Sequence, residues 1–265
     1  MSSVCFGMNL IFDTHAHYDS ESFEEDREQL LSSLPDRGVC GMINAGADLA
    51  GSRASLEIAG RYSWIYAAVG IHPEECGDLP ENWEEQIREM STAPKVVAIG
   101  EIGLDYHFED MAPRDVQKRV FEQQILLAKE RGLPVIIHDR DAHGDTMELL
   151  RKHRPRGVLH CFSGSVEMMR EVMALGMYIG LGGVVTFKNA RVPVEVAREV
   201  PLDRLLLETD APYMAPVPFR GKRCDSAMIA YSAARIAEIR GIPSQELLAQ
   251  TKANAERFFG LEEVK

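Results

Sequence analysis

Histidines and carboxylates at short spacings in this chain could hold a divalent metal ion. Asp13-Thr14-His15-Ala16-His17 follows the apolar run Leu10-Ile11-Phe12, and a short β-branched and aromatic run is typical of a buried strand. Residues two apart in a strand point to the same side, so His15 and His17 can present their imidazoles together. Such a pair suits a divalent metal, although the pair alone is equally compatible with chance or with a surface feature.

Further residues of the same kinds stand at the ends of later predicted strands. They are His72, Glu101, His138, His160 and Asp210. Five of the eight histidines therefore fall at predicted strand ends, whereas histidines with no shared role would scatter, as His107, His143 and His153 do. Imidazoles mixed with carboxylates, without thiolates, suit zinc, manganese or a magnesium-like ion.

Alternating strand and helix patterns predict the fold that brings these strand ends together. Predicted strands cover 10–12, 39–44, 64–69, 95–99, 134–137, 157–159, 178–181 and 204–207. Predicted helices cover 22–34, 49–61, 83–90, 114–131, 146–152, 166–175, 194–199 and the remainder from 225. The alternation indicates the α/β class and a single (β/α)8 TIM barrel over residues 1–265, with 1–8 as a short N-terminal extension. In such barrels, catalysis is found on the face formed by the loops that follow the strands.

The number of candidate ligands favours two metal ions over one. Two close divalent ions are typical of enzymes that cleave phosphoesters, because they activate water and offset charge in the transition state. Glu101 lies on the middle strand of the set and is the best placed to reach both ions. Asp210 follows a buried apolar run, so it needs a partner, and a metal supplies one; it is a candidate ligand, a candidate general base, or a cap of the next helix. Glu208 is interpreted as a supporting carboxylate that orients a histidine.

Basic and aromatic residues near the same strand ends could contact a substrate. The candidates are His72 at the third strand end, Arg140, and the loop residues Arg220 and Lys222, which could bind a phosphate. An ordinary solvated loop explains the basic segment 219–223 equally well. Phe162 and Tyr213 could stack on a base, although aromatic residues near a barrel mouth commonly serve packing.

Composition limits the classes of partner. The net charge of −12 disfavours a wide nucleic-acid footprint but permits a small contact centred on the site. The apolar runs are too short to cross a membrane, and the first eight residues have no features of a signal peptide. Five scattered cysteines argue against a disulfide framework and favour the cytoplasm. No obligate protein partner is inferred.

Six short motifs occur in order along the chain. They are IFDTHAHYD (11–19), GIHP (70–73), GEIGLDY (100–106), PVIIHDR (134–140), HCFSG (160–164) and LETDAP (207–212). Together they resemble the TatD family of metal-dependent deoxyribonucleases, within the amidohydrolase-type barrels, from residue 10 to about residue 259. In many amidohydrolase relatives a modified lysine bridges the metals, and Glu101 at this position favours the nuclease branch.

The resemblance implies a two-metal site and a nuclease activity. His15, His17 and Asp210 would bind one magnesium or manganese ion, His138 and His160 the other, and Glu101 would bridge them. Asp210 would also help to activate water. The implied reaction is 3′-end trimming of single-stranded DNA, with RNA as a further substrate.

Two segments depart from the family pattern. Loop five, Asp141-Ala142-His143-Gly144-Asp145, looks shifted, which would turn His143 toward the pocket. After Arg223 the chain has Cys224-Asp225-Ser226, where the family usually has an asparagine and then an acidic residue and a proline. How the eighth loop is held is therefore an open question.

Three classes of function remain at this point. The leading hypothesis is a metal-dependent phosphodiesterase that acts on nucleic-acid ends. The alternative is an amidohydrolase-type hydrolase of a small ester, amide or phosphoester, which the acidic charge favours. A non-enzymatic adaptor is disfavoured by the intact set of ligand candidates.

Overall fold

An eight-stranded parallel sheet is the centre of this structure, a computed structural model that describes residues 9–108 and 111–261. The strands pair in chain order from β1 to β8, every pair is parallel, and Ala16 bridges to Ala211 where the two edges meet. The strands are β1 (Ile11–Ala16), β2 (Val39–Ala45), β3 (Ile65–Val69), β4 (Val96–Asp105), β5 (Val135–Arg140), β6 (Gly157–Leu159), β7 (Tyr178–Leu181) and β8 (Leu205–Leu207). The predicted (β/α)8 barrel is confirmed.

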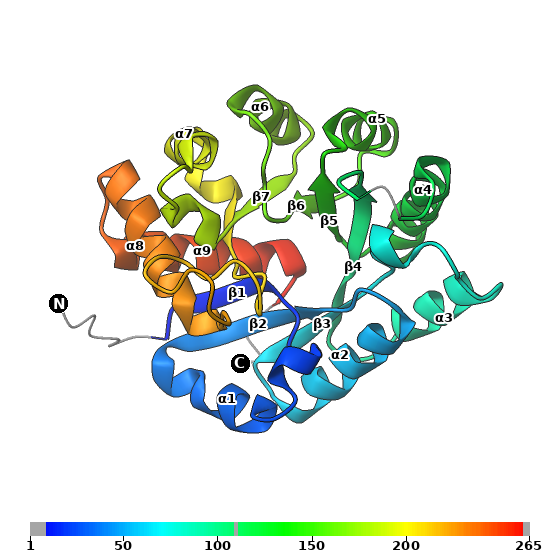
Figure 1. The fold of residues 1–265 in the computed structure, drawn as a ribbon, viewed down its shortest axis with the longest axis horizontal. Helices are drawn as coiled ribbons and strands as arrows, with labels where there is room; N and C mark the ends of the chain where they lie inside the picture. The colour runs from blue at the N-terminus through cyan, green and yellow to red at the C-terminus, as the bar shows by residue number, and fades with distance from the viewer. Residues whose placement is uncertain (1–8, 109–110, 262–265) are drawn as a thin grey trace.

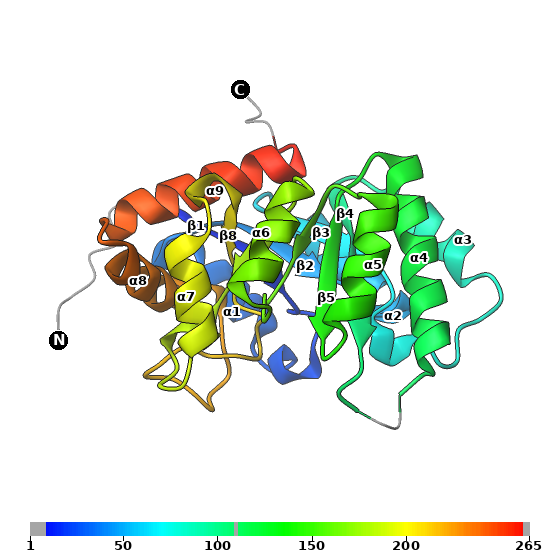
Figure 2. The same cartoon turned by 90° about the horizontal axis from the view of Figure 1, so that it is seen from above.

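Helices follow the strands and surround the sheet (Figures 1 and 2). They are α1 (Arg27–Ser33), α2 (Leu49–Arg61), α3 (Trp83–Met90), α4 (Arg114–Arg131), α5 (His143–His153), α6 (Val166–Ala174), α7 (Arg191–Glu199), α8 (Ile229–Arg240) and α9 (Ser244–Phe259). Local sequence sets several of their ends. The Asp48 carboxylate accepts the Gly51 N–H at the start of α2, and Gly132 ends α4 at a φ of 67°, a conformation that glycine adopts without strain.

Two layers of apolar side chains hold the barrel together. One cluster draws buried residues from every strand, including Phe12, Ile136 and Leu206, and packs against Phe258 and Phe259 of α9. This cluster is the barrel interior, and α9 closes it at one end. The larger cluster lies between the strands and the surrounding helices. The opposite end, formed by the carboxyl ends of the strands, is left for polar residues.

Several predicted boundaries were wrong. No continuous helix covers 22–34: a 3-10 helix, Glu21–Phe23, is followed by a turn and then by α1. Arg27, the first residue of α1, contacts the chain before this turn: its guanidinium donates to the backbone carbonyls of Tyr18, Asp19 and Ser20.

The strands that carry the metal-ligand candidates are longer than predicted. β1, β4 and β5 run past the predicted ends at residues 12, 99 and 137, so His15, Glu101 and His138 lie within strands. Two helices begin earlier than predicted, α5 at His143 and α7 at Arg191, and the segment from 225 holds two α-helices. Residues 1–8, predicted as an extension, lie outside the described residues. None of the described helices is long and apolar enough to cross a membrane.

Candidate metal centre

Imidazoles and carboxylates from six strands meet at the carboxyl end of the barrel. His15 comes from β1 and Glu101 from β4, and His138 comes from β5. The others lie within three residues of a strand end: His17 after β1, His72 after β3, His160 after β6 and Asp210 after β8. Three groups among these residues have ligand atoms within 4.8 Å of one another. The structure therefore brings together every predicted ligand, and His72 with them.

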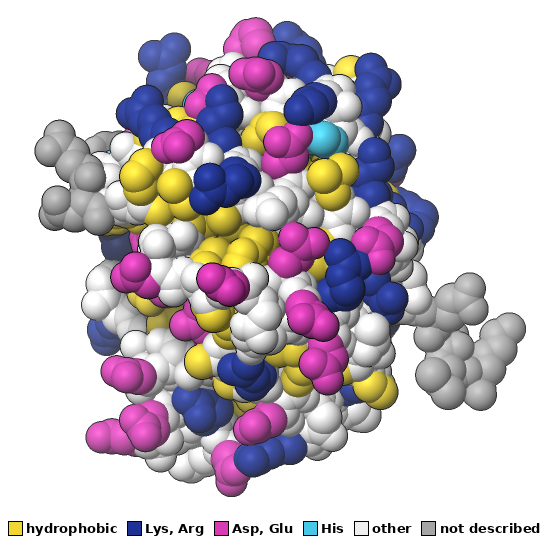
Figure 3. All heavy atoms as spheres, turned by 90° about the vertical axis from the view of Figure 1, so that its right-hand side faces the viewer, with side chains coloured by type: hydrophobic (Ala, Val, Ile, Leu, Met, Phe, Trp, Pro, Cys, Tyr) yellow, Lys and Arg dark blue, Asp and Glu magenta, His cyan; other side chains and the backbone are white. Residues whose placement is uncertain are grey.

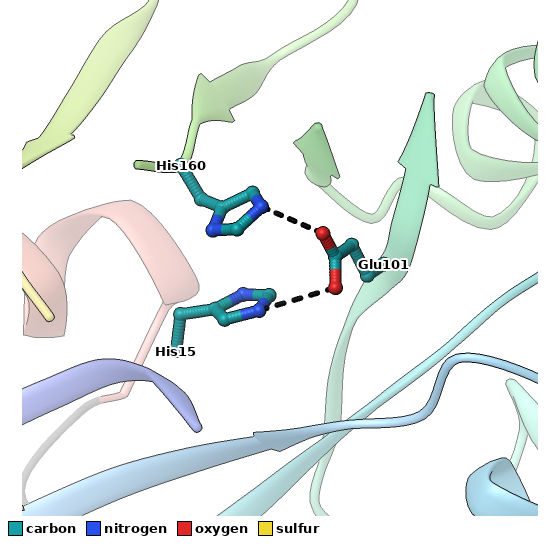
Figure 4. A group of neighbouring side chains, drawn as sticks. All are labelled: His15, Glu101 and His160. Carbon is teal, nitrogen blue, oxygen red and sulfur yellow. Dashed lines mark ion pairs between the residues drawn. The ribbon is translucent and has the colours of Figure 1, made fainter. Parts of the chain in front are cut away.

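Glu101 divides the centre into two halves. Its Oε2 lies 3.3 Å from His15 Nε2 and 3.2 Å from His17 Nε2. Its Oε1 lies 2.6 Å from His160 Nε2 and 2.9 Å from His138 Nδ1. Figure 4 shows the stacked His15 and His160 rings, with this carboxylate beside them and one of its oxygens toward each ring. A carboxylate with its two oxygens facing different sets of imidazoles has the geometry of a bridge.

The first group consists of His15, His17, Asp210 and the Oε2 oxygen of Glu101. The two imidazole Nε2 atoms are 2.9 Å apart, and Asp210 Oδ1 lies 3.7 Å from that of His15 and 3.5 Å from that of His17. Around a tetrahedral ion with metal–nitrogen distances of about 2.0–2.1 Å, neighbouring donor atoms lie about 3.3 Å apart. The spacing of this group matches the shell of a single ion.

The second group consists of His138, His160 and the Oε1 oxygen of Glu101, with His72 at its edge. His138 Nδ1 and His160 Nε2 are 3.4 Å apart. His72 Nε2 is 3.5 Å from Glu101 Oε1, and its ring meets the His138 ring edge to face at 4.4 Å.

Hydrogen bonds on the far sides of two imidazoles fix which nitrogen faces the centre. His17 Nδ1 lies 2.8 Å from the carbonyl oxygen of Ala45, and His138 Nε2 lies 2.9 Å from Asp105 Oδ2. Because these partners accept, each far nitrogen carries a proton, and the inward nitrogen of a neutral ring carries a lone pair. In a neutral ring this lone pair faces the Glu101 carboxylate, and either a proton or a metal cation between the two would stabilise the arrangement. This donor set fits a metal, since metal-binding histidines commonly donate their other N–H to a carbonyl or carboxylate.

The charges around the centre favour a bound cation. Burial opposes ionisation of Glu101, yet the imidazoles around it, His160 first, hold the pKa of its carboxyl well below its usual range. Burial lowers the pKa of His15 to about 4, so this ring is neutral and offers a lone pair. Burial also opposes charge on His138, but its hydrogen bonds to Asp105 and Glu101 raise its pKa to about 10. Ionised carboxylates that stabilise a proton here stabilise a metal cation equally.

The centre is buried on one side and open on the other. The His15 side chain is 0% exposed, whereas that of Asp210 is 16% and that of His138 is 18% exposed. Solvent and substrate therefore reach the centre past Asp210 and His138. An open side of this kind distinguishes a catalytic metal site from a closed structural one.

A buried carboxylate joins the strand and the loop that carry the first group. Asp13 Oδ1 accepts the backbone N–H groups of His15 and Thr209. Its Oδ2 accepts the hydroxyls of Thr209 and Ser226, both at 2.6 Å. Burial raises the pKa of Asp13 to about 6 against these bonds. The network holds His15 in place beside the start of the eighth loop.

Ser226 and Asp225 hold the eighth loop through hydrogen bonds to other parts of the chain. In addition to its bond with Asp13, Ser226 donates its backbone N–H to the Tyr18 hydroxyl at 2.9 Å. Asp225 binds the Arg37 guanidinium with both oxygens, at 2.9 and 3.0 Å, and caps Ala227 N–H. A proline in place of Ser226 would have neither the N–H nor the hydroxyl, so this chain uses its own set of contacts here.

Glu208 acts on the backbone beside His160 and forms no hydrogen bond with the imidazole itself. The predicted orientation of a histidine is therefore corrected: His160 Nδ1 is 4.0 Å away and has no hydrogen-bond partner, and Glu208 accepts the N–H of Cys161. Burial raises the pKa of Glu208 to about 8. Its carboxylate fills the space of a missing side chain at Gly180, where a Cβ atom would overlap it.

The three cations among the predicted substrate contacts face aromatic rings or solvent. The guanidinium of Arg140 lies 5.1 Å from the centre of the Phe108 ring, and that of Arg220 lies 4.4 Å from the Phe187 ring. Lys222 is exposed on the eighth loop. Among the described residues, no hydrogen bond or ion pair joins these three cations to the predicted ligands.

The predicted aromatic contacts and His143 have different surroundings. Phe162 is buried, whereas Tyr213 is 57% exposed. His143 bonds Asp139 at 2.7 Å at the start of α5 and makes no hydrogen bond to the centre.

Sequence reasoning missed two positioning carboxylates, Asp105 and Asp13. Asp105 contacts His138 only in the folded structure. Asp13 precedes His15 by two residues and accepts its backbone N–H. An aspartate that closes a long glycine-containing strand was the available signal for Asp105, and an aspartate buried before two histidines was the signal for Asp13.

Comparisons with known proteins agree with this geometry. Residues 12–260 match the model of a family described as TatD related DNase. An uncharacterized metal-dependent hydrolase of Bacillus subtilis, YabD, is 44% identical, covering 94% of this chain and 99% of its own length. The 3′-5′ ssDNA/RNA exonuclease TatD of Escherichia coli K12 is 35% identical, covering 95% of this chain and 99% of its own. The crystal structure of the TatD homologue YjjV from Escherichia coli K12 superposes with a TM-score of 0.90 at 33% identity, covering 96% of this chain and 99% of its own. The chain therefore belongs to the family of TatD-related DNases and is a metal-dependent hydrolase.

Proposed function

We propose that this protein is a 3′-5′ exonuclease that trims single-stranded DNA, and RNA as well, with two divalent ions. The observation that carries the proposal is the division of the centre by Glu101, whose two oxygens each face a separate set of imidazoles. A site for two close ions is typical of phosphodiester cleavage. The names of relatives such as the Escherichia coli exonuclease support the choice of substrate.

In this proposal the residues divide into two ligand sets. His15, His17 and Asp210 would hold one ion, His138 and His160 would hold the other, and Glu101 would be shared by both sets. When bound, magnesium or manganese would supply the Lewis acidity that activates water near neutral pH and offsets charge on the transferring phosphoryl group. Zinc fits the same donors.

Proton transfer and phosphate binding are assigned to side chains of the protein. Asp210 is the catalytic base, because it lies at the solvent-exposed edge of the first group, where it can accept the proton of the attacking water. Arg140, Arg220 and Lys222 bind phosphates upstream of the scissile bond. The small number of these cations restricts the contact to the strand end, in keeping with a net charge of −12.

The test is release of mononucleotides from a single-stranded oligonucleotide carrying a 3′ label. Metal is stripped, and magnesium or manganese is then added back. We expect trimming that returns with metal and is lost in His138→Ala. His153→Ala serves as the matched control, because His153 bonds Glu122 on the outer helices and its loss should leave trimming unchanged. A wild-type protein that binds metal without trimming any oligonucleotide would refute the proposal.

A hydrolase of a small ester, amide or phosphoester is the second candidate. The acidic charge of the chain favours it, because a small substrate needs no basic footprint. Hydrolysis of a small phosphoester that is indifferent to salt, together with no dependence on oligonucleotide length, would identify this alternative.

A further inference from the structure

His72 differs from its neighbours in the nitrogen that it presents to the metal centre. It follows β3 and caps the 3-10 helix Pro73–Glu75, where its Nδ1 accepts the backbone N–H of Glu74 at 3.2 Å. A backbone N–H can only donate, so Nδ1 must hold a lone pair. The proton of the ring is therefore on Nε2.

This protonated nitrogen points at the second group. His72 Nε2 lies 3.5 Å from Glu101 Oε1, the oxygen that already faces His138 and His160. His138 shows the opposite arrangement, because its far nitrogen donates to Asp105, so in the neutral ring its near nitrogen carries the lone pair. Two imidazoles in edge-to-face contact at 4.4 Å therefore offer the centre different chemistry, one a lone pair and the other an N–H.

We propose that His72 is a hydrogen-bond donor to a phosphoryl oxygen of the substrate at the second group, and not a third imidazole ligand of the ion there. An Nε2–H cannot coordinate a metal, since coordination needs the lone pair of a deprotonated nitrogen. Directed at an oxygen on which negative charge develops, the same N–H is a catalytic contact. The proposal rests on the phosphodiesterase function proposed above and adds the residue that recognises the phosphoryl group.

A backbone hydrogen bond fixes which nitrogen of His72 carries the proton. The Gly-Ile-His-Pro segment ends β3 and starts the 3-10 helix, and the first turn of a helix has N–H groups without helical partners. His72 satisfies one of them. The same bond that caps the turn fixes the tautomer, and the buried ring, 11% exposed, is held against rotation by its contact with His138.

The experiment separates ligand from donor with measurements that do not need turnover. His72→Gln keeps an N–H group near the position of Nε2, and His72→Ala removes it. Metal content is measured on purified, metal-loaded protein, with His138→Ala as the ligand control. We expect both His72 variants to keep the wild-type metal content while His138→Ala loses metal. The ¹⁵N chemical shifts of the His72 ring in the wild type should report a protonated Nε2.

Inorganic phosphate and the oligonucleotide then probe the donor itself. We expect phosphate to bind metal-loaded His72→Ala about tenfold more weakly than the wild type, with most of the loss restored in His72→Gln. On the oligonucleotide, kcat of His72→Ala should fall by about 10²–10³, as for loss of one oxyanion donor, with His72→Gln in between.

Three results would overturn the proposal. They are loss of metal in both His72 variants to the extent seen in His138→Ala, an unprotonated Nε2 in the ¹⁵N spectrum, or phosphate affinity unchanged in His72→Ala. If the wild type trims no oligonucleotide while the metal, ¹⁵N and phosphate results are as expected, the exonuclease function fails and the donor role of His72 stands.

Discussion

At the residue scale, the second nitrogen of each imidazole decides what the first can do. The Ala45 carbonyl accepts a hydrogen bond from the far N–H of His17, and Asp105 accepts one from that of His138, so in the neutral rings the near nitrogens carry lone pairs. Glu74 donates to the far nitrogen of His72, which leaves an N–H. Residue type alone would give these three histidines the same role, and their hydrogen-bond partners give them different ones.

Removing the Asp105 carboxylate tests how the hydrogen bond to the far nitrogen of His138 affects metal binding by that ring. We expect Asp105→Ala to weaken metal binding at the second group by about 10–100-fold, because His138 loses the acceptor that orients its ring and raises its basicity. Asp105→Asn keeps an acceptor and should recover part of the affinity. Titration of metal-free protein followed by calorimetry measures this, with Asp115→Ala on the exposed start of α4 as control. Equal affinity in Asp105→Ala and the wild type would contradict the assigned role.

At the element scale, irregular strands aim the ligands. The pairing of β1 with β2 shifts register between Asp13 and Ala16, and that of β4 with β5 shifts between Ile99 and Ile102. His15 and Glu101 lie within these shifts. Because irregular pairing turns side chains away from simple alternation, strand period alone does not give their direction. Gly103 permits β4 to pass close to the backbone of His138 on β5, since a Cβ on residue 103 would overlap that backbone.

The contacts of Ser226 hold a loop to this irregular edge, and their value can be measured. We expect Ser226→Ala to lower the free energy of unfolding of the metal-free protein by about 1–3 kcal/mol, because buried Asp13 loses a hydroxyl donor. Urea denaturation gives the change, and Ser32→Ala, at an exposed position of α1, should alter it little. A Ser226→Ala protein as stable as Ser32→Ala would show that Asp13 gains little from this bond.

At the scale of the whole molecule, charge limits how a nucleic acid can bind. Basic and acidic side chains are interspersed over the face of the molecule seen in Figure 3, and the chain carries a net charge of −12. A long electrostatic contact of the kind that duplex-binding proteins make is therefore disfavoured. The proposed phosphate contacts are limited to Arg140, Arg220 and Lys222.

Salt dependence tests this arrangement quantitatively. Three phosphate contacts to a single strand predict that log affinity falls with log salt concentration with a slope of about −2. Lys222→Ala should reduce its magnitude by about 0.7, whereas Lys152→Ala, whose amine pairs with Glu122 on the outer helices, should not change it. Oligonucleotide binding by fluorescence anisotropy in metal-loaded protein provides the measurement. A slope near zero would favour the small-substrate hydrolase.

The barrel, and the residues that gather at its carboxyl end, were predictable from the amino-acid sequence. Apolar runs alternating with helical patterns specify strands and helices because burial follows local periodicity. Once the strands are parallel, their carboxyl ends meet, so His15, Glu101, His138, His160 and Asp210 converge wherever their exact strand boundaries fall. The break in the helix predicted over 22–34 comes just before Arg27, whose bonds to backbone carbonyls no periodicity encodes.

The separate roles of the converging groups depend on three-dimensional contacts. Which oxygen of Glu101 faces which imidazoles depends on register shifts in β1 and β4. Which nitrogen of His72 or His138 carries the proton depends on Glu74 and Asp105, because a tautomer is fixed by the atom opposite the far nitrogen. These partners come from backbone geometry and from contacts across strands, so they exist only after the chain has folded.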